Sequence, residues 1–379
     1  MSFDCREGGF VQGERLPPLS DNEIGGRGKV LDFVRAGKLG SEQRAALMFE
    51  WIEFQNYKAL RKANLPLSRF TLIVGANGSG KSTALNAITA LANPRKWLAD
   101  AIRTAGVPAS ESVQLTAKWV EDKGAYRFTS QWTPGGKGPL IKPIDRQEMG
   151  FTERLAARLQ RARLYSLHAF AIAEQVHLRP QIELAPSGAN LAGVLDRLRD
   201  QYPERFESLN QELMRWIPEF DKVLFETPRE GHRSIALRTR EGKHSIRATD
   251  LSQGTLIALA LLTIAYVPEP PSIVCLEEPD HGLHPRLLRD VKDALYRLAF
   301  PEGSGEKREP VQVIATTHNP YFLDLFKEHP EQIVIAEKVG LEAKFSRLSD
   351  RKDLDEILAD APLSEVWYSG VLGGVPMGT

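Results

Sequence analysis

The chain has 379 residues, of which 42% are hydrophobic and 26% are charged, as in an ordinary globular protein of one or two domains. Lysine and arginine together number 49, as do aspartate and glutamate, so the formal net charge is zero. This balance excludes a global field that would attract the protein to nucleic acid or to a membrane, although it permits a local basic patch.

Cysteine use, the N-terminus and the hydropathy pattern together indicate a cytoplasmic protein. The two cysteines, Cys5 and Cys275, are far apart, and the apolar surroundings of Cys275 argue against a disulfide framework. The N-terminus lacks the charged start and apolar stretch of a signal peptide. The longest apolar run, residues 256–267, is too short to span a bilayer, so we expect no membrane partner.

The first 45 residues are rich in glycine, proline and charge. We expect a loosely ordered extension there or, alternatively, a clasp onto a partner or a second copy of the chain. Strands are predicted over residues 49–60, which alternate apolar and polar side chains, and over residues 68–74. Phe54 and Tyr57 are candidates for stacking on a nucleobase and equally for ordinary places in the core.

Residues 70–90 predict a buried strand, a glycine-rich turn and a helix. The turn from Gly75 to Ser82 fits the phosphate-loop pattern G-x-x-x-x-G-K-[ST]. Its glycines let the backbone approach a phosphate, and the N–H groups and the helix dipole attract negative charge. Lys81 would add a positive charge for the β- and γ-phosphates, and the Ser82 hydroxyl would bind magnesium.

The middle of the chain predicts a hairpin, helices and short strands. The hairpin covers residues 113–120 and 125–132, and a loop follows at 134–145. Helical spacing at 148–163 favours a solvated face or, alternatively, a basic face for nucleic acid, formed by Arg154, Arg158, Arg161 and Arg163. The other elements expected here are a strand at 163–173, helices at 189–198 and 203–216, and strands at 220–225, 233–237 and 244–248.

The last third of the chain predicts alternating helices and buried strands. The expected elements are an apolar helix at 250–267, strands at 272–276, 311–315 and 333–336, a helix at 286–298, helical spacing at 352–358 and a glycine-rich end at 367–379. No heptad pattern is sustained over three repeats, which excludes long coiled-coil arms.

Two carboxylates directly follow the apolar strand at 272–276. A phosphate loop needs an acidic residue to hold the magnesium waters and a general base to orient the attacking water. Glu277 fits the first role and Glu278 the second. The alternative, two surface acids on a loop, is weak because an apolar strand rarely ends in Glu-Glu-Pro by accident.

Each of two further motifs is weak evidence for nucleotide binding when taken alone. The set becomes specific because the order along the chain is phosphate loop, Ser252 and Gly254, acidic strand, and His318. Ser252 and Gly254 place a hydroxyl and a glycine N–H at a helix start, which suits an anion but also suits an ordinary N-cap. His318 follows another strand and would contact the γ-phosphate.

These residues resemble the ATP-binding-cassette (ABC) class of ATPases, and more closely the RecF/SMC-like, OLD-type AAA ATPases of prokaryotes. The resemblance begins near residue 46 and is carried by residues 75–83, 251–256, 277–285, 317–320 and 367–376. It implies an α/β fold, an ABC-type P-loop NTPase head whose mixed β-sheet is flanked by helices. The implied parts are an N-terminal extension (1–45), a first core part (46–105), an inserted hairpin and helical lobe (106–249) and a second core part (250–379).

The resemblance also implies ATP and Mg²⁺ as cofactors and a head-to-tail homodimer with two ATP molecules between the subunits. ATP would be bound by Asn77, Gly78, Ser79, Gly80, Lys81, Ser82 and Thr83. The other subunit would contribute Ser252, Gly254 and Asp280. The catalytic residues would be Glu278 and the switch histidine His318, and the metal would be held by Ser82 and Glu277.

This sequence departs from the ABC pattern at two points. Glu277 stands where cassette ATPases usually carry aspartate, and the extra methylene is tolerable because magnesium is usually reached through water. The glutamine that normally links the metal to the helical lobe is not placed, and Gln175 and Gln181 are its candidates.

Two pairs of residues suggest other chemistry. His281 and His284 suggest a metal pair, but zinc needs more ligands than the sequence offers. Asp353 and Asp355 resemble the acidic pair of a TOPRIM nuclease, but the stretch after His318 is too short for a typical domain. We therefore expect no nuclease in this chain.

The sequence thus predicts an ATPase that dimerises around ATP as a switch and reopens after hydrolysis. Its output would pass to a separately encoded effector protein, or to DNA or RNA, as in prokaryotic anti-phage defence or DNA repair. The alternative is a nucleotide-gated structural scaffold with negligible turnover. A transporter motor is a weaker third interpretation.

Overall fold

A computed structural model describes residues 48–121, 124–136, 138–144, 151–179, 183–340 and 342–373. Every element described below belongs to one compact unit, Arg44–Thr379. The predictions for residues 1–45, for Gln181 and for residues 374–379 lie outside the described residues.

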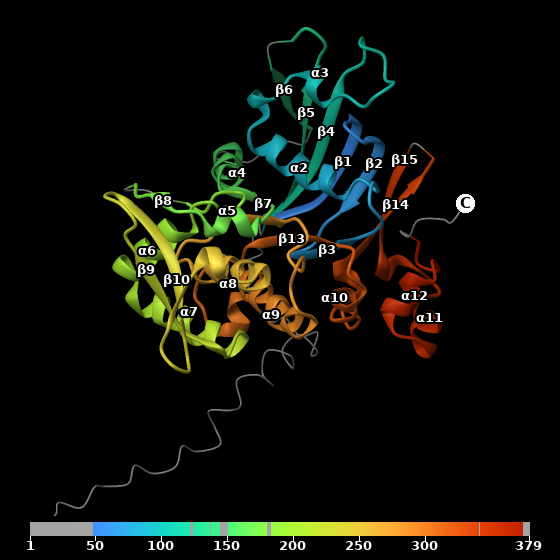
Figure 1. The fold of residues 1–379 in the computed structure, drawn as a ribbon. Coiled ribbons are helices and arrows are strands. Elements are labelled where there is room, and N and C mark those ends of the chain that lie inside the picture. The colour runs from blue at the N-terminus through green and yellow to red at the C-terminus, as the bar shows by residue number, and fades with distance from the viewer. Residues whose placement is uncertain are drawn as a thin grey trace, which may run out of the picture. The chain divides into compact units, whose positions relative to one another are not determined.

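A six-stranded sheet lies at the centre of this unit, in the order β15-β14-β3-β13-β12-β7 (Figure 1). Its strands are β15 (Glu342–Arg347), β14 (Ile333–Val339), β3 (Phe70–Val74), β13 (Gln312–Thr317), β12 (Ile273–Leu276) and β7 (Ala162–Tyr165). Neighbouring strands are parallel except for β14 and β15. The strands β3, β12 and β13 are buried along their whole length, as parallel strands covered on both faces usually are.

A second sheet is antiparallel, in the order β2-β1-β4-β5-β6. Its strands are β1 (Met48–Tyr57), β2 (Leu60–Pro66), β4 (Val113–Glu121), β5 (Gly124–Trp132) and β6 (Pro139–Pro143). It shares one hydrophobic core with the helix α2 (Lys81–Ala92) and with one face of the central sheet, to which Ile73, Cys275 and Ile314 belong. The helix that follows the phosphate loop is therefore held by both sheets.

The other face of the central sheet belongs to a second core, to which Leu72, Val274 and Val313 contribute. Successive side chains of a strand point to opposite faces, so each strand serves both cores. The longest helices of this core are α6 (Leu191–Gln201), α7 (Pro203–Trp216), α8 (Gln253–Tyr266) and α9 (Leu288–Ala299). In α8 every residue from Thr255 to Tyr266 is buried, as expected for a helix that is apolar all round.

The smaller elements complete the unit. A third sheet has the order β11-β10-β8, with β9 also paired to β10, and consists of β8 (Val176–His177), β9 (Phe220–Glu226), β10 (His232–Thr239) and β11 (Ser245–Arg247). The remaining α-helices are α3 (Ala99–Ile102), α4 (Phe151–Gln160), α5 (Ala169–Ala173), α10 (Pro320–Asp324), α11 (Leu354–Asp360) and α12 (Leu363–Tyr368).

The fold class predicted from the sequence is confirmed: a mixed sheet carries the phosphate loop and is flanked by helices. The longest described helices have 14 residues, so the part of the chain that the structure describes holds no long coiled-coil arm. Nor does any described helix combine the length and apolar character needed to cross a membrane. The four-part division at residues 45, 105 and 249 stays a prediction.

Some local predictions were wrong, because strand pairing decided the outcome. Residues 139–143 form β6 on the edge of β5, within a stretch predicted to be a loop. The strand predicted over residues 163–173 ends at Tyr165, where its pairing with β12 ends, and α5 follows. The strands β2 and β15 were missed, and both pair with a preceding strand through a short turn.

The aromatic and arginine predictions are also corrected. Phe54 and Tyr57 are fully buried in the core between the two sheets, so neither is available to stack on a nucleobase. Arg158 is buried and pairs with Glu309, while Arg163 lies in β7 and pairs with Glu183. The four arginines predicted as one helical face are therefore split between α4, the turn after it and β7.

Gln312 is a buried polar side chain that ties β13 to the antiparallel sheet. Its Nε2 donates to the carbonyls of Phe49 at 2.7 Å and Ser68 at 3.0 Å, and its Oε1 accepts from the Phe49 N–H at 2.9 Å. Replacing it by leucine would leave these buried backbone groups without partners, at a cost of about 1–3 kcal/mol each.

We predict that Gln312→Leu lowers the free energy of unfolding by at least about 2 kcal/mol, measured by urea denaturation. The control is Gln160→Leu, at an exposed position of α4, which should change that free energy by less than about 0.5 kcal/mol. Equal effects of the two substitutions would contradict the role assigned to Gln312.

Candidate functional site

The phosphate loop connects β3 to α2 and depends on two glycines for its shape. Gly80 precedes the first residue of α2 with φ +97°, a conformation that side-chain-bearing residues rarely adopt. A Cβ on Gly75 would clash with the carbonyl oxygen of Ala336 in β14, so only glycine fits there. The loop is therefore anchored on the central sheet, with the first N–H groups of α2 free of side-chain caps.

Lys81 folds back over the loop. Its Nζ donates to the carbonyl oxygens of Gly75 at 2.7 Å and Ala76 at 3.0 Å. Burial lowers the pKa of Lys81, while the nearby carboxylates of Glu278 and Glu277 act in the opposite direction. An anion bound in the loop would give this cation a stronger partner than two neutral carbonyls.

The parallel pairing places the carboxyl end of β12 beside the phosphate loop. The strand β13 lies between β3 and β12, so the residues after these three strands share one edge of the sheet. At this edge the Ser82 hydroxyl hydrogen-bonds to the Glu277 carboxylate. Magnesium prefers oxygen ligands, and this pair of oxygen donors fits it. The structure thus brings together the two residues predicted to hold the metal.

Glu278 has a strained backbone and a defined partner. Its φ is +45°, which is uncommon for a residue other than glycine. The Glu278 N–H donates to Thr316 Oγ1 at 3.2 Å, and its carbonyl accepts from His281 N at 2.9 Å. His318 Nδ1 lies 2.9 Å from Glu278 Oε1. The two predicted catalytic residues are therefore in contact, although they are 40 positions apart in the sequence.

Asp280 is directed into the protein. Its side chain is buried, and its Oδ2 accepts a hydrogen bond from Thr317 Oγ1 at 3.0 Å. Burial raises the pKa of Asp280, and the hydrogen bond from Thr317 offsets part of that effect. The contact across a dimer predicted for Asp280 would therefore involve its loop rather than its carboxylate.

Ser252 and Gly254 begin α8. The Ser252 side chain is exposed and caps the helix, accepting from the Thr255 N–H at 3.1 Å. A Cβ on Gly254 would lie 2.8 Å from the carbonyl oxygen of Gly282, so this turn packs closely against the loop after Glu278. The contact of these two residues with ATP bound to a second copy of the chain stays a prediction.

The two acidic residues also line a cavity of about 560 Å³. Ser166 and His168, which follow β7, line it together with Glu277, Glu278 and His281. The Glu277 N–H donates to the carbonyl of Tyr165 at 2.9 Å, so the end of β7 is fixed beside the acids. His168 is not apparent from the sequence, because the pattern predicts that this strand continues to residue 173. Gln175 does not line the cavity, and Gln181 lies outside the described residues.

One member of each pair that suggested other chemistry, His284 and Asp353, has a partner of its own in the structure. Within the described ranges no group of three or more histidine, cysteine, aspartate or glutamate side chains could hold a metal ion. The His284 Nδ1 accepts from the Arg286 N–H at 3.2 Å, and the Asp353 carboxylate pairs with Arg351. Cys275 is a free, buried thiol whose pKa burial raises.

Two family models match the chain. Residues 106–324, more than half of the chain, match the family described as "AAA domain, putative AbiEii toxin, Type IV TA system". Residues 48–125, which contain the phosphate loop, match the family described as "AAA ATPase domain".

Individual relatives are distant. The chain is 22% identical over 364 residues to a protein named OLD nuclease from Thermus scotoductus (strain ATCC 700910 / SA-01), covering 82% of this chain and 66% of that protein. It thus spans slightly less than two thirds of that relative.

Two solved structures are similar. An SMC head domain from Thermotoga maritima has a TM-score of 0.45 and 18% identity, covering 79% of this chain and 98% of that one. A structure titled recombination mediator protein RecF-ATPrS in the RecFOR pathway has a TM-score of 0.47 and 12% identity, covering 80% and 99%.

The family matches cover both the phosphate loop and the acidic strand, which the fold brings to one edge of a single sheet. The chain belongs to the family described as "AAA domain, putative AbiEii toxin, Type IV TA system".

Proposed function

We propose that this protein binds and hydrolyses ATP and uses ATP-driven dimerisation as a switch that controls an effector protein or a DNA transaction. The observation that carries the proposal is the contact between the Ser82 hydroxyl of the phosphate loop and the Glu277 carboxylate, with Glu278 and His318 directly beside it. A loop that only shaped a turn would not need two carboxylates and a histidine at its edge.

Each of these residues has a role in hydrolysis. Loop N–H groups and Lys81 would hold the phosphates of ATP, with Lys81 moving from the loop carbonyls to the γ-phosphate. Ser82 and Glu277 would hold Mg²⁺, which would neutralise phosphate charge. Glu278 would accept the proton of the attacking water, and His318, whose Nδ1 lies against Glu278, would hold Glu278 in place and contact the γ-phosphate.

The dimer is proposed from the exposed start of α8. Ser252, which is exposed, and the N–H groups of the first turn of α8 would form an anion-binding corner. A second copy placed head to tail would bring this corner to the γ-phosphate held by the first copy. The close packing of Gly254 on Gly282 would then connect each corner to the loop that follows Glu278.

The names of the matching family and of the curated relative support a proposal for the partner that receives the signal. The matching family is described as a putative toxin of a type IV TA system, and one curated relative is named a nuclease. This chain spans 66% of that relative, and we expect no nuclease within it. We therefore propose that a separately encoded effector, or DNA or RNA, receives the signal in the cytoplasm, in anti-phage defence or DNA repair.

We predict that Glu278→Gln traps a larger assembly in the presence of magnesium and ATP, because ATP binds but hydrolysis no longer reopens the dimer. Ser252→Arg should abolish that assembly, since a bulky cation fills the anion corner. Mass photometry or light scattering of wild type and both variants measures this. Ser208→Arg, at an exposed position of α7, is the matched control. If the mass of every variant is the same with and without ATP, while ATP still binds, the scaffold alternative is favoured.

We predict that Lys81→Ala weakens ATP binding by about 10- to 100-fold, because charge-assisted hydrogen bonds contribute about 1.5–3 kcal/mol each. Isothermal titration calorimetry measures the affinity, and Lys62→Ala, at an exposed position of β2, is the control. Unchanged affinity in Lys81→Ala would rule out phosphate binding by this loop.

We predict a pH-dependent effect of Asp280→Asn on stability. Because burial raises the pKa of Asp280 in the folded protein, the folded state binds its proton more tightly than the unfolded state. The contribution of Asp280 to the free energy of unfolding therefore falls as the pH rises through the raised pKa. Asparagine does not titrate, so the variant should gain stability relative to wild type between about pH 4 and about pH 8.

Urea denaturation at the two pH values measures this difference. Asp350→Asn, at an exposed position, is the control and should show a smaller change with pH. A relative stability of Asp280→Asn that falls with rising pH would show that the carboxylate is needed in its ionised form.

A further inference from the structure

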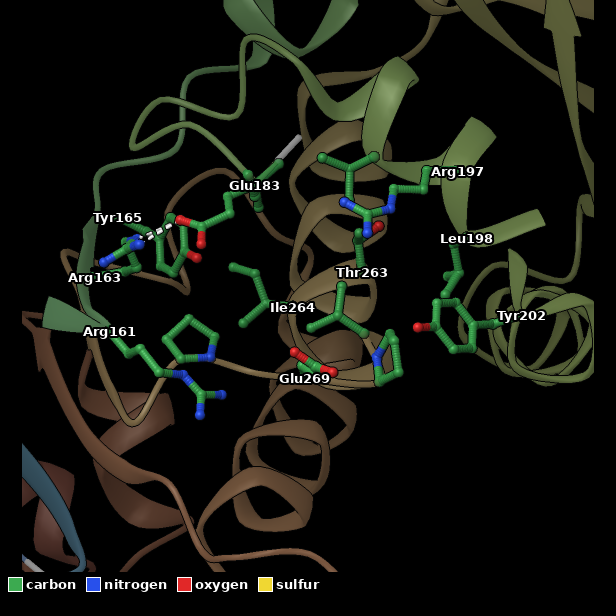
Figure 2. Close-up of a pocket in the computed structure, with 15 residues that line it drawn as sticks. Arg161, Arg163, Tyr165, Glu183, Arg197, Leu198, Tyr202, Thr263, Ile264 and Glu269 are labelled. Carbon is green, nitrogen blue, oxygen red and sulfur yellow. Dashed lines mark hydrogen bonds and ion pairs between the residues drawn. The ribbon is translucent and has the colours of Figure 1, made fainter. Parts of the chain in front are cut away.

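A second cavity, of about 220 Å³, lies away from the phosphate loop (Figure 2). It is lined by α6, by the carboxyl end of α8, by the turn before β7 and by the proline-rich connection after α8. The strand β7 runs parallel to β12, so Arg161, which precedes β7, is at the opposite end of the pair from Glu277. The residues of this cavity have no part in the proposed hydrolysis.

Two arginines reach this cavity from different walls without an ion-pair partner. Arg197, on α6, uses its Nε to bond Gln201 Oε1 at 2.8 Å. Arg161 donates from Nη2 to the carbonyl of Pro270 at 2.8 Å. Neither guanidinium pairs with a carboxylate in the described parts of the chain, so each keeps free N–H donors. A third arginine, Arg163, is already neutralised by Glu183, as the dashed line in Figure 2 shows.

The rest of the lining gives the cavity a mixed character. Ile264 and Leu198 supply apolar surface, and Tyr202 adds an aromatic ring that is 37% exposed. Glu269 is exposed beside them and forms no ion pair with any described cation. Two arginines and one carboxylate without ion-pair partners among the described residues therefore line one small cavity that also has apolar walls.

We propose that this cavity binds a small organic dianion, with one anionic group at Arg197 and the other at Arg161. Guanidinium groups bind carboxylates and phosphates through paired N–H donors, so two of them on separate walls select a ligand with two anionic groups. A monoanion would leave one arginine unsatisfied. Glu269 would accept an N–H or O–H of the ligand between its anionic groups.

The volume limits the size of the ligand. Pockets for drug-sized molecules have about 300–1,000 Å³, and this cavity is smaller. It therefore suits a dicarboxylate or a small bisphosphate better than a nucleoside triphosphate. The helix α8 begins next to Ser252, and its carboxyl end lines this cavity. A ligand here would therefore contact the end of α8 opposite to Ser252.

The proposal is tested by isothermal titration calorimetry of the full chain with succinate, L-glutamate, fructose 1,6-bisphosphate, butyrate and inorganic phosphate. We expect one molecule of a dianion per chain, at least about tenfold tighter than butyrate or inorganic phosphate. A preference for succinate or for the bisphosphate identifies the anionic group. L-Glutamate should lose affinity in Glu269→Gln while succinate does not, since only the amine uses Glu269.

The variants Arg197→Gln and Arg161→Gln should each weaken dianion binding by about 10- to 100-fold. Arg95→Gln, in the turn after α2, is the matched control, and Lys81→Ala should leave dianion binding unchanged. Melting curves of each variant confirm that it is folded.

The proposal is overturned if no dianion saturates the protein at millimolar concentration, or if folded Arg197→Gln and Arg161→Gln bind as wild type. It is also overturned if Lys81→Ala abolishes binding, because the anion would then occupy the phosphate loop. None of these outcomes depends on ATP hydrolysis, so the proposal stands or fails separately from the ATPase.

Discussion

The parallel pairing of β3, β13, β12 and β7 is the constraint on which the site depends. Parallel strands end at the same edge of a sheet, so residues that are 40 and 195 positions apart in the sequence meet there. Ser82 reaches Glu277, and His318 reaches Glu278, only because β13 lies between the strands that carry the loop and the acids. The strain at Glu278 is held in place by contacts at this edge.

The two hydrophobic cores hold that edge in position. Alternate side chains of each central strand belong to different cores, one shared with α2 and the antiparallel sheet, the other with α8 and α9. The loop helix and the helix that begins at Ser252 are thus fixed to opposite faces of one sheet.

Residues near the phosphate loop were predictable because local chemistry dictates them. Glycines, Lys81 and the carboxylates after an apolar strand each have a recognisable reason in the sequence, and the fold class follows from alternating buried strands and helices. His168 was missed because its place depends on where β7 stops pairing with β12, which is a tertiary event. The same reason explains the missed β2 and β15. Phe54 and Tyr57 could not be assigned because the sequence does not reveal which face of β1 the second sheet buries.

The most direct test of the account is the rate of phosphate release from magnesium-ATP by wild type and Glu278→Gln, with ATP binding measured in parallel. If Glu278 is the general base, the variant should bind ATP normally and release phosphate about 10²- to 10⁴-fold more slowly than wild type. Equal rates in the two proteins, with normal ATP binding in both, would contradict the mechanism and leave a nucleotide-gated scaffold as the better description.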